Sequence, residues 1–145
     1  MDVRPAGITG AWVRRCVAAT LRAERAGGRA VSVVVTDDRR MRALNRKHLR
    51  HDTTTDVVSF EAGEAGGGAY LGDVVVCAPY ARRIAASLGI DLKEELARYL
   101  VHGTLHLLGY DDLKEPQRSR MHRRQEAVLA RALGRRPRGW SDGRT

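Results

Sequence analysis

The sequence predicts a single domain of the α/β type, more closely α+β, in which helices flank a small mixed sheet. Three observations predict this fold. Runs of β-branched residues alternate with amphipathic segments. The segment 91–108 is apolar nearly all round, as in a central helix, and 145 residues suffice for one domain with its own core. We place this domain at residues 1–133 and expect the basic tail 134–145, rich in Gly and Pro, to be disordered.

The first expected elements are a helix and a strand. Residues 10–26 carry apolar side chains three and four positions apart with arginines mostly between them, which is typical of an amphipathic helix. The glycine pair at 27–28 ends this helix. The mostly β-branched run 29–38 follows and predicts a strand that is buried on both faces.

A second helix and two more strands are expected next. Thr36 or Asp37 can cap a helix over residues 38–49. Strands are predicted at 55–60 and 69–78, and a glycine-rich loop joins them. Because no Lys-Ser/Thr pair follows these glycines, the loop is not of the phosphate-binding type.

Three helices complete the chain. A helix over 79–89 begins near a proline and ends at a glycine. The helix 91–108 has Asp91 as its candidate N-cap, with Glu94 three residues on as in a capping box. The last helix covers 116–133. One buried face of the helix 91–108 is expected to carry Leu96, Leu100, Gly103 and Leu107.

Composition restricts the partners and the location. Lys and Arg number 26 against 17 Asp and Glu, a formal charge of +9, and a basic surface rich in Arg attracts phosphate backbones. The alternative is that Arg simply serves as the common surface residue. Cys16 and Cys77 lie in apolar contexts, so buried free thiols are expected rather than a disulfide. With no membrane-spanning stretch and no signal core, we expect a cytoplasmic protein and no membrane partner.

The stretch HGTLHLLGYDD, residues 102–112, suggests a metal site. His102 and His106 stand at i and i+4 on one helix face, with Cβ atoms roughly 6 Å apart. Gly109 can adopt the left-handed conformation and turn the chain back, so that Asp111 or Asp112 approaches the histidines. Two imidazoles and a carboxylate make a catalytic type of zinc site with one position left open for water.

A metal assignment that rests on spacing alone has one alternative, and the residues between the histidines argue against a zinc peptidase. Two histidines four residues apart are often a partly buried, hydrogen-bonded pair. The zinc peptidase motif H-E-x-x-H uses its Glu as general base, but Gly103, Thr104 and Leu105 stand between the histidines here. A peptidase would therefore lack its base.

Three segments together resemble one known family. HGTLHLLGYDD resembles the signature H-G-x-L-H-L-x-G-Y-D-H of the YbeY endoribonuclease family. LNRKHLRHDTTTDVVSF (44–60) is similar to the family segment L-N-x-x-[YF]-R-x-x-D-x-x-T-D-V-L-S-F, and LGDVVVC (71–77) to its L-G-D-[IL]-x-I strand. The segments occur in the family order and at compatible spacings, so the combination is far more specific than HxxxH alone.

The resemblance implies roles for individual residues. His102 and His106 match the first two metal-binding histidines of the family. The third family ligand is a histidine, but Asp112 occupies its position, so we expect Asp112 to be the ligand. Asp111 then has a structural or supporting role, as does Gly109 in the turn. His122, within the last helix, is the less favoured substitute.

An arginine of the family motif is displaced. The family has a functionally important Arg in its YRG stretch, and the matching position here is Leu49, with Arg50 beside it. Arg50 is therefore the candidate catalytic residue, and His51 is the other candidate source of positive charge. A solvated basic loop is the alternative. No individual RNA-binding residue is identified from the sequence.

The resemblance implies a single-strand-specific, metal-dependent endoribonuclease. Its expected role is rRNA maturation, in late processing of the 3′ end of small-subunit rRNA, and ribosome quality control, with ribosomal RNA and the ribosome or its small subunit as partners. One Zn²⁺ per chain is expected, and the carboxylate ligand should also tolerate harder divalent metals such as Mn²⁺. The alternatives are a non-catalytic, RNA-binding ribosome-assembly factor with a structural metal, and a metal-dependent hydrolase of another substrate.

Overall fold

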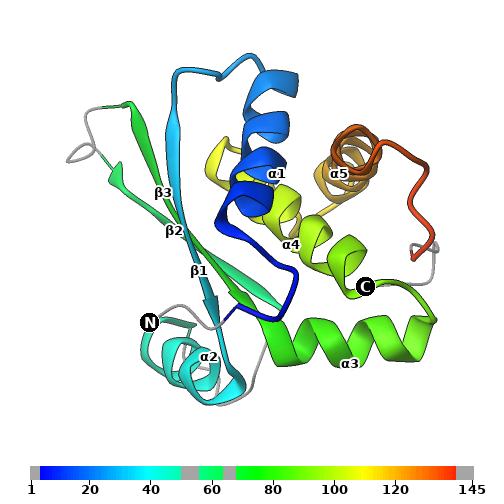
Figure 1. The fold of residues 1–145 in the computed structure, drawn as a ribbon. Coiled ribbons are helices and arrows are strands. Elements are labelled where there is room, and N and C mark those ends of the chain that lie inside the picture. Colours follow the sequence, from blue (N-terminus) through cyan, green and yellow to red (C-terminus); the bar gives the residue numbers. More distant parts are fainter. Residues whose placement is uncertain (1–3, 50–55, 64–67, 140–145) are drawn as a thin grey trace.

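The structure, a computed structural model, describes residues 4–49, 56–63 and 68–139. Helices and the strands of a small sheet follow one another along the chain in the order that the sequence predicts. This confirms the α+β fold (Figure 1). The elements are α1 (Gly10–Ala23), β1 (Ala30–Thr36), α2 (Asp38–Leu44), the π-helical segment η1 (Asn45–Leu49), β2 (Val57–Glu61), β3 (Tyr70–Cys77), α3 (Ala78–Leu88), α4 (Leu92–Leu107) and α5 (Gln117–Leu133).

The sheet is mixed and has β3 at its centre. Its strand order is β1-β3-β2, with β1 parallel and β2 antiparallel to β3. The register pairs Val35 with Val76 and Val58 with Val75. Since β3 has a neighbour on each side, most of its residues are buried, and its last four form a continuous buried run.

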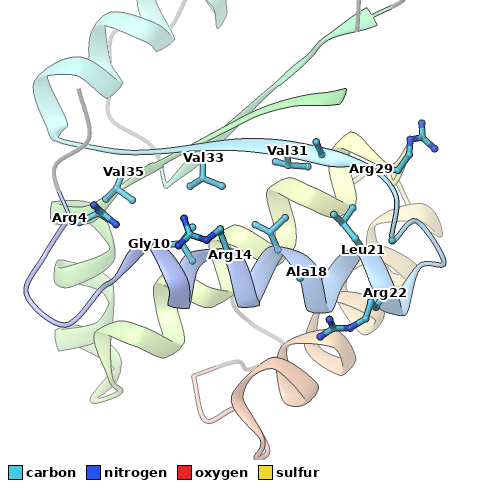
Figure 2. Close-up of a pocket in the computed structure, with 14 residues that line it drawn as sticks. Arg4, Gly10, Arg14, Ala18, Leu21, Arg22, Arg29, Val31, Val33 and Val35 are labelled. Atoms are coloured by element: carbon cyan, nitrogen blue, oxygen red, sulfur yellow. The ribbon is translucent and has the colours of Figure 1, made fainter. Parts of the chain in front are cut away.

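The expectation that β1 is buried on both faces is wrong for most of the strand. Only Val35 and Thr36, at its end, are fully buried. The physical reason is an incomplete cover. A groove of about 870 Å³ lies between α1 and β1 and leaves Val31 and Val33 half-buried (Figure 2). Arginines contribute to its walls, namely Arg4, Arg14, Arg22 and Arg29.

Helix α4 is the central element, as its sequence predicts. It contacts α1, α3, α5 and the strands β2 and β3, and Figure 1 shows it between the sheet and α5. The expected face is buried along its whole length, at Leu96, Leu100, Gly103 and Leu107. The side chains of Tyr99, Val101 and Leu105 are buried too. The core therefore surrounds this helix.

Gly103 allows α4 to lie directly on the sheet. A Cβ atom at this position would be 2.6 Å from Val74 Cγ1, closer than real Cβ atoms come, and in a tight contact of 3.1 Å with Val57 Cγ2. The Ser59 hydroxyl on β2 donates a hydrogen bond to the Gly103 carbonyl at 3.0 Å. The close contact falls next to His102, in the part of α4 that carries both histidines.

A side chain caps the N-terminus of α1 and of α2, but not that of α3, α4 or α5. Asp37, rather than Thr36, caps α2 by accepting a bond from Arg40 N at 2.9 Å. The helix expected to reach residue 26 ends at Ala23, before the left-handed Arg25. Asp91 is at the N-cap of α4 but makes no side-chain cap bond. Instead of completing a capping box, Glu94 is turned into the interior and is fully buried.

The segment 134–139 differs from the disordered tail expected there. Its backbone binds the buried carboxylate of Glu94, with amide donation from Arg138 at 2.9 Å and from Gly139 at 2.7 Å. The Arg135 guanidinium adds a third bond at 2.8 Å. A buried carboxylate needs such partners, and this segment supplies them. Residues 140–145 lie outside the described part of the chain.

Both cysteines are buried and carry free thiols, as expected. Burial raises the pKa of the Cys16 thiol to about 11, against the smaller opposing effect of Arg15. Among the residues that the structure describes, no helix is both long and apolar enough to cross a membrane.

Candidate functional site

The turn after α4 brings Asp112 beside His102. Gly109 has a φ of 103°, a conformation that glycine adopts readily. Its amide donates to the His106 carbonyl at 3.1 Å, and the Tyr110 amide donates to the Leu105 carbonyl at 3.2 Å. The chain therefore folds back over the end of the helix, and Asp112 Oδ2 lies 3.2 Å from His102 Nε2.

Two further contacts hold this turn. The Tyr110 hydroxyl donates to Glu24 Oε1 at 2.6 Å, and the Arg124 guanidinium also binds the Glu24 carboxylate. The turn is thereby tied to the end of α1 and to α5. Asp111 accepts a bond from the Leu113 amide at 2.9 Å, so its carboxylate closes the local loop.

His102 is held from its other side by α5. Its Nδ1 lies 2.7 Å from Gln125 Oε1. The Gln125 amide group in turn donates to Glu126 Oε2 at 2.9 Å. The imidazole is therefore fixed between Gln125 and Asp112, with one ring nitrogen on each.

The His102–Asp112 contact shifts the pKa of both groups. Burial alone would lower the pKa of His102, but the contacts with Asp112 and Gln125 outweigh it and raise that pKa. The bond from His102 lowers the pKa of Asp112, and the nearby His106 lowers it further. An ionised Asp112 is therefore the stable form at neutral pH.

The remaining residues expected at the site form no hydrogen bond or ion pair with the His102–Asp112 pair, or lie outside the described part of the chain. His106 lies one turn beyond His102 on α4 and is half-buried. His122 is half-buried within α5. The π-helical segment ends at Leu49, and Arg50 and His51 lie outside the described residues.

Two residues near His102 were not assigned a role from the sequence. Asp56, just before β2, is close enough for its charge to raise the pKa of His102. Its position within the TTTDVVSF stretch was a usable signal. Gln125 is 23 residues from His102, and nothing in its sequence context marks it as a partner.

The donor set suits a divalent cation by its chemistry. Two imidazoles with a carboxylate are a common zinc set, and the Nδ1 contact leaves His102 Nε2 as the ring nitrogen that faces Asp112. Within residues 4–49, 56–63 and 68–139, however, no three His, Cys, Asp or Glu side chains are gathered closely enough to hold a metal ion. The structure therefore brings two of the three expected donors, His102 and Asp112, into direct contact.

Comparison with known proteins finds many relatives. The sequence profile described as Endoribonuclease YbeY matches residues 7–133. Proteins named Endoribonuclease YbeY are 49% identical over 105 residues in Anaeromyxobacter dehalogenans (72% of this chain, 54% of that protein) and 40% identical over 121 residues in Thermus thermophilus (81% and 87%). The chain spans about half the length of the Anaeromyxobacter relatives that it matches.

A solved structure has the same fold. The solution structure of TM1509 from Thermotoga maritima superposes with a TM-score of 0.65 at 21% identity, covering 90% of this chain and 86% of that one. This likeness concerns the fold alone. The family match over most of the chain carries the assignment, and the chain belongs to the YbeY endoribonuclease family.

Proposed function

We propose that this protein is a single-strand-specific, metal-dependent endoribonuclease. It acts in rRNA maturation, on the 3′ end of small-subunit rRNA, and in ribosome quality control. The observation that carries the proposal is the His102–Asp112 pair at the turn after α4, at 3.2 Å, in a chain of the YbeY family. Its partners are ribosomal RNA and the ribosome or its small subunit, in the cytoplasm.

His102, His106 and Asp112 would hold one Zn²⁺ per chain. When bound, the ion would supply a water of lowered pKa and polarise a phosphoryl oxygen. The protein residues do the rest of the work. Gln125 and Asp112 orient the His102 ring from both sides, and the anchored turn holds Asp112 at the helix end. The partial exposure of His102 and Asp112, 29% and 39%, leaves room for a substrate to reach them.

RNA affinity is expected to come from charge. The formal charge of +9 attracts a phosphate backbone without regard to sequence. Arg50 is the proposed group that stabilises charge on the phosphate in the transition state. The salt dependence of RNA binding measures this electrostatic contribution.

A cleavage assay tests the proposal. The substrate is a single-stranded RNA carrying the 3′ end of small-subunit rRNA, with a duplex of the same sequence for comparison. We expect cleavage of the single strand that a chelator abolishes and added Zn²⁺ or Mn²⁺ restores. His106→Ala should lose it, whereas His122→Ala, a histidine replacement within α5, should retain it.

The other outcomes identify the alternatives. RNA binding without chelator-sensitive cleavage would indicate an assembly factor with a structural metal. Turnover of a peptide or small ester, without RNA cleavage, would indicate a hydrolase of another substrate. RNA cleavage that persists in His106→Ala would point to a contaminating nuclease and contradict the proposal.

A further inference from the structure

A continuous chain of polar contacts runs from the candidate site into the interior. His102 Nδ1 contacts Gln125 at 2.7 Å, Gln125 donates to Glu126 at 2.9 Å, and Glu126 receives Arg98 Nε at 3.0 Å. We call these four residues the α4–α5 polar chain. It joins two residues of α4, one helical turn apart, through two neighbours on α5.

The inner end of this chain is fixed by charge. Arg98 binds Glu126 through two nitrogens, Nε at 3.0 Å to Oε2 and Nη2 at 3.1 Å to Oε1. A guanidinium only donates, so the Glu126 carboxylate accepts both bonds. Arg98 itself is 2% exposed, and a buried arginine in a bidentate pair has little freedom to turn.

This fixed carboxylate determines which way the Gln125 amide points. Both oxygens of this carboxylate accept bonds from Arg98, so Glu126 acts as an acceptor and Gln125 must present its NH₂ group to it. The Gln125 carbonyl oxygen then faces His102. Because that oxygen only accepts, the bond requires a proton on His102 Nδ1. Nε2, the nitrogen that faces Asp112, is then the ring nitrogen left for an ion, which would take the place of the Nε2 proton shared with the Asp112 carboxylate.

We propose that Gln125 is a positioning residue for the metal site: it selects the His102 tautomer that binds a divalent ion through Nε2. Glu126 and Arg98 act behind it by holding the Gln125 amide in one orientation. This inference rests on the proposed function, since it presumes a metal at His102. It adds a requirement, acceptance of the Nδ1 proton by α5, that the HxxxH motif does not contain.

Zinc affinity of the full chain, measured by competition with a chromogenic chelator, is the first test. Gln125→Met keeps the size of the side chain but removes the acceptor, and we expect it to weaken Zn²⁺ binding about 10–100-fold. Gln117→Met, the same change at an exposed position of α5, should bind like the wild type.

The ring nitrogen that binds zinc is the second readout, which a merely structural role would not move. In the zinc-loaded chain, ¹⁵N shifts of His102 should report Nε2 ligation in the wild type and in Gln125→Glu, which keeps an acceptor opposite Nδ1. Gln125→Met should show ligation shared between Nδ1 and Nε2. If Gln125→Met does not fold, Gln125→Glu decides, because loss of Nε2 ligation there contradicts the proposal.

The failure of this inference differs from the failure of the proposed function. A wild-type chain that binds no zinc overturns both. A wild-type chain that binds zinc, with Gln125→Met binding it equally tightly through Nε2 alone, overturns only the role of Gln125.

Discussion

Ionisable side chains lie at both ends of α4. They are buried and fully paired at the N-terminal end, and partly exposed at the C-terminal end. At the N-terminal end, Glu94, Glu95 and Arg98 are 0%, 0% and 2% exposed. All three guanidinium nitrogens of Arg98 donate to carboxylates, at 2.7 to 3.1 Å. At the C-terminal end, His102 and Asp112 share one contact of 3.2 Å and remain partly exposed.

The difference separates a structural charge cluster from a candidate site. A largely buried cluster whose hydrogen bonds are all made within the protein offers nothing to a substrate. It contributes to stability, because breaking it leaves buried charges unpaired. A partly exposed pair can exchange its mutual contact for an ion or a phosphate. Perturbed pKa values occur at both ends, so exposure, rather than the shift, distinguishes them.

Removal of Arg98 should have the largest effect on stability. Arg98→Met leaves Glu94, Glu95 and Glu126 without their shared cation in the interior, which should cost about 3–5 kcal/mol of unfolding free energy. Urea denaturation of the full chain measures this cost. Arg118→Met, which removes an exposed ion pair with Glu115, is the control and should leave the midpoint unchanged. A loss below ~1 kcal/mol for Arg98→Met would mean that the cluster is not structural.

A methyl group at Gly103 should have the next largest effect. Gly103→Ala forces α4 away from Val74 and Val57 and should cost roughly 1–3 kcal/mol through overpacking. It should also weaken zinc binding, because the displaced segment carries both histidines. Gly27→Ala, where an added Cβ meets nothing within 4 Å, is the matched control. Equal stability of the two variants would contradict the close contact.

Acid should loosen the N-terminal end of α4. Burial alone would raise the pKa of Glu94, but bonds from Arg135, Arg98 and two backbone amides outweigh it and lower that pKa. A depressed pKa contributes stability above the unfolded value, near ~4.3, which is lost as the pH falls through the folded value. Denaturation midpoints between pH 5 and 3 should therefore fall less steeply in Glu94→Gln than in the wild type. Parallel slopes would refute this linkage.

Much of the fold was predictable because its signals are local. Alternation and β-branching mark the strands, and the apolar run of α4 marks a central helix. The spacing of His102 and His106 likewise places both on one helix face. The glycine at 109 indicates the turn that returns a carboxylate to that face. Each of these signals lies within about ten residues of the feature that it predicts.

The remainder depends on contacts between distant segments. The exposure of β1 follows from how α1 packs over it. This packing cannot be predicted from the residues of β1 alone. Glu94 has the spacing of a capping residue, but the amides of 138 and 139, more than forty residues away, draw it inward. Gln125 faces His102 only because α5 packs on α4.

The most direct test of the contrast between the two ends is a zinc titration of the 145-residue chain in three forms. The wild type and Asp91→Ala, which removes an exposed carboxylate at the N-terminal end, should each bind one equivalent with the same affinity. Asp112→Ala should lose at least the ~10–100-fold that removal of a supporting residue costs. A full equivalent bound by Asp112→Ala with unchanged affinity would contradict the account.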